Sequence, residues 1–388
     1  MALQSATVLA SPEIGFYVSR LSIFCRYLHN ASMAAVTLDH SNALVRDSQQ
    51  AIIRWLLIVA GLVFAMVVVG GVTRLTRSGL SIVEWKPLMG AIPPITEQSW
   101  LAEFAKYQQT PEYLHVNHGM TLTEFKEIFY VEWAHRLLGR LIGLAVFVPM
   151  IYFIVRKRIS SKLLPKLVIM LILGGLQGAL GWYMVSSGLI DIPRVSPYRL
   201  TAHLALAVAI YSYVLWIVFD LRRAGQSDST VANSSLTNIS WCVTTLVCLM
   251  MLAGGFVAGT KAGFVFNTFP LMSGQFIPPG AYAMDPWWVN LFENVATVQF
   301  NHRLLAYVLA IAGGYFYAVA LRSKLPAHIR KAVHVFEFAI VAQIALGIST
   351  LLLIVPVWLG ALHQAGALVV LTIALYLNHS LRPSYTRY

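Results

Sequence analysis

The chain has 388 residues, of which 58% are hydrophobic and 11% are charged. Soluble domains are about 45–50% apolar and about 25% charged, so this composition excludes a soluble globular protein and a disordered chain. Three cysteines exclude a disulfide scaffold. The net charge of +12 is explained better by basic loops on the inner side of a membrane than by nucleic-acid binding, which we do not expect.

Eight continuous apolar segments are each long enough to cross a bilayer as a helix, which takes about 20 residues. Their apolar runs do not alternate, which argues against a β-barrel. The sequence therefore predicts an all-α, polytopic membrane protein with eight transmembrane helices. The expected spans are residues 52–72, 129–155, 163–187, 199–221, 239–260, 298–321, 331–354 and 358–379.

The loops predict the orientation. Lys and Arg gather after the second, fourth and sixth spans, whereas the first outer loop is acidic, so both termini are expected on the cytoplasmic or matrix side. In that outer loop, Thr121 and Glu124 have the spacing of a capping box that starts the helix leading into the second span. Residues 1–51 form an inner-side tail without a clear targeting signal. A bacterial plasma membrane is favoured, with the mitochondrial inner membrane as the alternative.

An internal repeat divides the chain. Residues 131–138 align with 298–305, Gly70-Gly71 with Gly254-Gly255, and Gln177 with Gln343. The sequence thus predicts two four-helix bundles, residues 52–221 and 239–381, joined by a linker over 222–238. Because each half has an even number of spans, the repeats are parallel.

Four histidines stand near the outer starts of the even-numbered spans: His135, His203, His302 and His363. A single intramembrane histidine is equally well explained by a hydrogen bond to a neighbouring helix. Two matched pairs on facing helices instead suit the two axial positions of a haem iron. Zinc fits less well, because a tetrahedral zinc site needs further ligands beside each histidine pair. Glu132 is a possible further ligand, and no Cys, Asp or third His accompanies either pair.

The repeats differ at Glu132, which aligns with Gln299. Glu132 shares a helix face with His135. It either forms a salt bridge to Arg136 or Arg140, or places a negative charge beside a reactive porphyrin edge. The second interpretation predicts a working haem site in the first half and a haem-holding site in the second.

Four arginines have both a functional and a structural interpretation. The other polar, aromatic and small residues below have a structural interpretation. Arg74, Arg77, Arg136 and Arg303 contact haem propionates or anchor the helix ends at the interface. The matched amides Gln177 and Gln343 are expected to join helices. Glycines 174, 178 and 181 are expected to let helices approach closely. Tryptophans 85, 100, 287 and 288 are expected at the outer interface.

These motifs resemble the haem A synthase family over about residues 52–380. The resemblance is carried by Gly-Gly-Val-Thr-Arg-Leu-Thr-Arg-Ser-Gly-Leu-Ser (70–81), Thr-Leu-Thr-Glu-Phe-Lys (121–126), Glu-Trp-Ala-His-Arg-Leu-Leu-Gly-Arg (132–140), Tyr-Arg-Leu-Thr-Ala-His (198–203), Gln-Phe-Asn-His-Arg (299–303) and Leu-His-Gln (362–364).

The resemblance implies oxidation of a methyl group of haem o to the formyl group of haem a, by two hydroxylations with oxygen from water. It implies that His135 and His203 flank the substrate haem, that His302 and His363 ligate haem b, and that Glu132 is the essential carboxylate. Some bacterial members carry a cysteine pair in the first outer loop, which this chain lacks.

The expected partners are a haem o synthase as substrate donor, membrane lipid, an unidentified electron acceptor and a second copy in a homo-oligomer. A dihaem b-type electron carrier is the alternative function, and a haem transporter or chaperone is a third.

Overall fold

The computed structural model describes residues 47–86, 89–190, 193–223 and 234–382. The chain divides into two units, Met1–Arg54 and Trp55–Tyr388. Of the first unit, the structure describes residues 47–54, which are helical. The remaining expectations for the tail at residues 1–46 lie outside the described residues. All contacts given below belong to the second unit.

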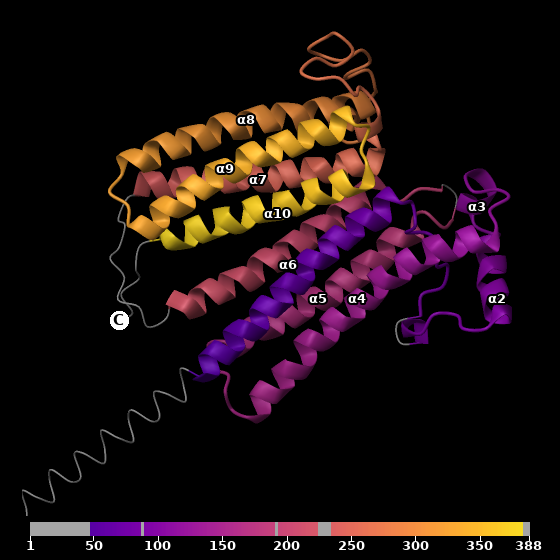
Figure 1. Cartoon of the computed structure of the whole chain (residues 1–388), viewed down its shortest axis with the longest axis horizontal. Helices are drawn as coiled ribbons and strands as arrows, with labels where there is room; N and C mark the ends of the chain where they lie inside the picture. Colours follow the sequence, from indigo (N-terminus) through magenta and orange to yellow (C-terminus); the bar gives the residue numbers. More distant parts are fainter. Residues whose placement is uncertain (1–46, 87–88, 191–192, 224–233, 383–388) are drawn as a thin grey trace, which may run out of the picture. The chain divides into compact units, whose positions relative to one another are not determined.

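The described residues contain eight helices that are long and apolar enough to cross a membrane, which confirms the all-α, polytopic architecture. Each expected span overlaps one of them. They are Asp47–Leu75, α4 (Leu122–Val155), α5 (Leu164–Ser186), α6 (Pro197–Arg223), α7 (Ser234–Thr260), α8 (Val295–Arg322), α9 (Ala327–Leu352) and α10 (Val357–Ser380), with α4 to α10 labelled in Figure 1.

The outer loops contain short helices: η1 (Met89–Ala91), α2 (Glu97–Tyr107), α3 (Pro111–His115), η2 (Ala262–Phe264) and η3 (Trp287–Leu291). The expected start of the helix at Thr121, ahead of the membrane span expected from residue 129, is confirmed. Helix α4 begins at Leu122 because the capping box forms: Glu124 accepts a hydrogen bond from the backbone of Thr121 at 2.7 Å, and Thr121 caps Glu124 in return. The expected linker is shorter than residues 222–238, since α6 and α7 extend into both of its ends.

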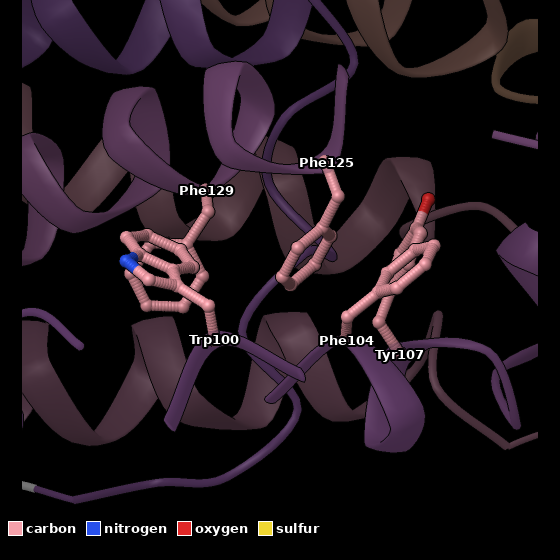
Figure 2. Close-up of a cluster of buried hydrophobic side chains, with 5 residues drawn as sticks. All are labelled: Trp100, Phe104, Tyr107, Phe125 and Phe129. Carbon is pink, nitrogen blue, oxygen red and sulfur yellow. The ribbon is translucent and has the colours of Figure 1, made fainter. Parts of the chain in front are cut away.

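Five aromatic side chains fasten α2 to the start of α4. Trp100, Phe104 and Tyr107 lie on one helix, and Phe125 and Phe129 lie on the other (Figure 2). The Trp100 ring meets Phe129 edge to face at a centroid distance of 5.0 Å. Trp100 is therefore buried against α4 rather than exposed on the surface, and its expected depth at the membrane interface stays a prediction. This packing fixes the first outer loop over the end of the bundle from which α4 starts.

Each half closes into a ring of four helices. In the second half α7 contacts α8, α8 contacts α9, α9 contacts α10, and α10 returns to α7. In the first half α4 contacts α5 and α5 contacts α6. The first span joins both ends of that series, because Trp55 donates a hydrogen bond to the carbonyl of Ala145 on α4 and Phe64 packs on Tyr211 of α6. Helices α4 and α6 are thus diagonal partners, as are α8 and α10.

The halves meet through corresponding glycines. Gly71 on the first span lies against the amide of Gln364 on α10, the residue after His363. Gly255 on α7 lies against Leu204 on α6, the residue after His203. A Cβ atom at Gly71 would make the end of the Gln364 side chain move, and one at Gly255 would press on Thr201 and Leu204, so both glycines allow close contact between the halves. Such paired contacts are what two parallel repeats related by a two-fold axis would make. The division of the chain into two domains at the linker stays a prediction.

Candidate active site

The four histidines lie on the diagonal helices of the two bundles. His135 is on α4 and His203 on α6, and the two lie close enough for their charges to interact. His302 on α8 and His363 on α10 form the corresponding pair. The structure thus brings together within each half the two histidines that the sequence paired.

A glycine on an odd-numbered span faces each imidazole ring. If the glycine carried a Cβ atom, that atom would lie 2.9–3.4 Å from Cε1 of the ring. At Gly347 a Cβ atom would displace the ring, at Gly70 and Gly181 it would press on the ring, and at Gly254 it would reach ordinary contact distance, so the glycines let the rings lie close to the neighbouring helix. The four pairs are Gly70 with His135, Gly181 with His203, Gly254 with His302 and Gly347 with His363.

A glutamine holds the second histidine of each pair. Gln343 on α9 donates to the backbone carbonyl of His363 at 2.7 Å, and its amide nitrogen lies 3.1 Å from Nδ1 of the same ring. Gln177 on α5 donates to the carbonyl of His203 at 3.1 Å and lies 3.3 Å from its Nε2. The expectation that these amides join helices is confirmed, and the residues that they join are the paired histidines.

These surroundings fit a haem in each half. The Nδ1 atoms of His135, His203 and His302 are buried without a hydrogen-bond partner, although all four histidines are partly exposed as whole residues. A buried imidazole nitrogen without a partner is costly, which indicates a site completed by a ligand. Among the described residues, no group of three or more His, Cys, Asp or Glu side chains could hold a bare metal ion. Each histidine pair would supply two imidazoles to one haem, and the division into a haem b site and a substrate site stays a prediction.

Changing Gly347 to alanine should disturb the second haem site. The new Cβ would lie 2.9 Å from Cε1 of His363, so the ring must move away from its position for ligation. We expect a shifted Soret band and low-spin electron paramagnetic resonance signal, with about 1–3 kcal/mol of destabilisation. Gly314→Ala on α8 is the matched control, because its Cβ would meet open space. Identical spectra for the two variants would contradict the assignment.

Glu132 is buried, with 3% of its surface exposed, and it holds the loop that follows the first span. Its Oε2 accepts hydrogen bonds from Ser81 Oγ and Ile82 N, both at 2.8 Å. Its Oε1 accepts from Arg136 Nε at 3.0 Å and from Nη2 at 2.6 Å. The salt bridge to Arg136 is present, and all four acceptor sites of the carboxylate are used. Its position beside a porphyrin edge stays a prediction.

Gln299 occupies the corresponding place in the second half but has the opposite hydrogen-bond role. Its amide nitrogen donates to the carbonyls of Ala262 and Val265, at 3.0 and 2.6 Å. The loop after α7 therefore presents acceptors where the loop after the first span presents donors. The hydrogen-bond groups of the two loops therefore explain why one half has Glu132 and the other has Gln299. A difference in chemistry between the two sites is a second explanation.

Arg136 and Arg303 fasten these same loops. Arg136 donates to the carbonyls of Ile82 and Glu84, and Arg303 donates to those of Phe266 and Thr268. Both arginines thus use their fork-shaped donor groups to fix backbone, which accounts for their matched positions without a haem propionate. Their contact with propionates stays a prediction.

Arg74 and Arg77 lie at the end of the first span. Arg74 donates to the carbonyls of Ala258 and Gly259 at 3.0 and 3.2 Å, which caps the last turn of α7 and joins the halves. Arg77 is exposed and adopts a left-handed conformation with φ of 54°.

Three glycines on α5 were expected to let helices approach closely. Gly181 does face His203, but Gly174 and Gly178 face open space, so the expectation of close helix packing is wrong at these two positions.

Comparison with known proteins identifies the family. Residues 53–375 match the family model described as cytochrome oxidase assembly protein. A relative named "Heme A synthase" from Nitrosospira multiformis is 53% identical, over 86% of this chain and 94% of the relative. Relatives with the same name from Nitrosomonas eutropha and Parvibaculum lavamentivorans are 50% and 49% identical, over 84% and 89% of this chain and 92% and 98% of theirs. The chain therefore belongs to the family of cytochrome oxidase assembly proteins that includes these relatives.

Proposed function

We propose that this chain is a haem A synthase, an oxidoreductase that converts haem o to haem a. The observation that carries the proposal is the asymmetry of two otherwise matched histidine pairs. In the first half His135 shares its helix with a buried carboxylate, Glu132, whereas in the second half His302 shares its helix with a buried amide, Gln299. The two loops account for the hydrogen-bond roles of these residues, and the proposal adds that the negative charge of Glu132 also serves the chemistry of the first half. The relatives named for this activity support the same conclusion.

The proposed reaction oxidises a methyl group of haem o by two successive hydroxylations with oxygen from water, and the resulting diol loses water to give the formyl group. The haem irons supply the redox chemistry. His135 and His203 hold the substrate haem, and His302 and His363 hold haem b. The negative charge of Glu132 stabilises an electron-poor carbon at the porphyrin edge. Arg136 and Ser81 keep that carboxylate in one position.

The proposal includes a bacterial plasma membrane as the location, with both termini on the inner side, where Lys and Arg gather in the loops. A haem o synthase is the proposed donor of substrate, and an electron acceptor receives the electrons. The hydrophobicity of haem o is consistent with delivery through the bilayer.

The test is chemical analysis of the haems that the chain makes. The protein is expressed with a haem o synthase in a host that lacks haem a, and extracted haems are weighed by mass spectrometry. We expect haem a or its hydroxymethyl intermediate, and neither from the host with haem o synthase alone. Unmodified haem b and haem o in a folded, haem-loaded protein would instead identify an electron carrier or haem chaperone.

A further inference from the structure

One face of α5 leaves space inside the first bundle. Gly174, Gln177, Gly178 and Gly181 share this face, because they are spaced by three and four residues along the helix. The face points into the bundle, since Gly181 lies against the ring of His203 and Gln177 donates a hydrogen bond to the His203 carbonyl. A Cβ atom placed on Gly174 or Gly178 would nevertheless have no neighbour within 4 Å.

Isoleucine stands on the corresponding face of α9. In the alignment of the repeats Ile340 takes the place of Gly174, and Ile344 takes the place of Gly178. Ile340 is buried, with 2% of its surface exposed, and its Cδ1 lies 2.9 Å from where a Cβ atom would stand on Gly313 of α8. The glycine on α8 thus accommodates the side chain that α5 lacks. The second bundle is therefore closed at this level.

The first bundle does not fill the same space with another side chain. Val146 on α4 aligns with the α8 glycine and is buried, yet it does not come within 4 Å of a Cβ atom placed on Gly174. The buried residues of α5, Leu167 and Met170, both precede Gly174, whereas those of α9 continue as far as Thr350. An apolar space inside a helix bundle is suited to an apolar ligand.

This space begins at the paired histidines of the first half. Gly174 precedes Gly181 by two helical turns, which is about 10 Å along the axis. At the Gly181 end, Nδ1 of His203 and Oε1 of Gln177 are both buried without a hydrogen-bond partner. Buried polar atoms in native sites normally have a partner, so these two atoms indicate that a ligand completes the site. Part of that ligand would then extend along α5 toward the middle of the span.

We propose that the space beside Gly174 and Gly178, here called the α5 slot, holds the isoprenoid chain of haem o and selects haem o over haem b. The inference rests on the proposed function, in which haem o is the substrate of the first half. Haem o carries a farnesyl-type chain where haem b carries a small vinyl group. In the second half Ile340 fills the equivalent space, so that half accepts a haem without the chain and excludes one that carries it.

The test places the isoleucine of the second half in the first. Gly174→Ile should fill the α5 slot and lower the affinity for haem o at least about tenfold, as small changes of shape in apolar pockets do, without changing the affinity for haem b. Gly175→Ile is the matched control: its Cβ also meets open space, but the aligned residue, Val341, is 58% exposed, so this position faces outward. Protein purified with haem b in its second half is titrated with haem o and, separately, with haem b, and binding is followed by Soret absorption.

The outcomes are distinct. Equal affinity for haem o in Gly174→Ile and in the control overturns the proposal. An equal loss of affinity for both haems also overturns it, because a slot for the chain must discriminate between them. If Gly174→Ile loses the haem b of the second half, Gly174→Ala takes its place, and a loss confined to haem o is again expected. The titration measures binding without turnover, so absence of haem a from the wild type would refute the proposed function separately.

Discussion

His302→Ala should abolish binding of haem b and, with it, formation of haem a. The change removes one of the two histidines that we propose hold haem b, and His363 alone would hold it far less tightly. Loss of even an outer-shell partner costs a metal site about 10- to 100-fold in affinity, so loss of a ligand should cost more. The b-type haem of purified protein, measured as its pyridine haemochrome, should fall at least about tenfold.

His328→Ala is the control for this result. His328 is exposed at the start of α9 and is paired with none of the four histidines in the bundles. It should retain haem b and activity. Full haem b content in His302→Ala would show that another residue is the ligand and would remove the basis for assigning the second half to haem b.

Glu132→Gln should leave haem bound while lowering haem a formation by at least about 100-fold, the usual effect of removing one preorganised electrostatic group. Gln299 in the second half stands beside Arg303, four residues further along the helix, as Glu132 stands beside Arg136. The amide oxygen of the variant can still accept from Ser81 and Ile82, but its NH2 group then faces the donors of Arg136, so haem content must be measured along with activity. The substitution thus removes the charge and keeps the shape.

The matched control is Glu127→Gln, which changes an exposed carboxylate on the same helix. Haem content is measured spectroscopically and haem a by mass spectrometry in both variants. If Glu132→Gln makes haem a at the rate of the wild type, its carboxylate serves only to fasten the loop. Loss of haem as well as activity would show the same structural role, since the proposed electrostatic role requires that haem stays bound.

The opposite change in the second half, Gln299→Glu, is not equivalent to Glu132→Gln, because the two loops present different hydrogen-bond groups to this position. Gln299→Glu would place a carboxylate against the carbonyls of Ala262 and Val265, where the native amide donates two hydrogen bonds. Acceptors would then face acceptors in a buried site. The two halves are therefore not interchangeable at this residue, although their sequences align around it.

The sequence alone determined the membrane architecture, the helix type and the pairing of the histidines. These properties depend on local composition and on repetition along the chain: an apolar run of about 20 residues can satisfy its backbone in lipid only as a helix. The capping box at Thr121 and Glu124 was equally local, and it formed as expected. The match between the halves was visible because the same residues recur at the same spacing.

Only the tertiary structure decided what the polar side chains contact. Glu132 was expected either in a salt bridge or free at a haem edge, and its partners Ser81 and Ile82 stand in a loop far away in sequence. Trp100 was expected at the interface, but α2 folds back on α4 and buries it. Hydrogen bonds and burial between distant segments leave no periodic trace, so three-dimensional packing alone sets them.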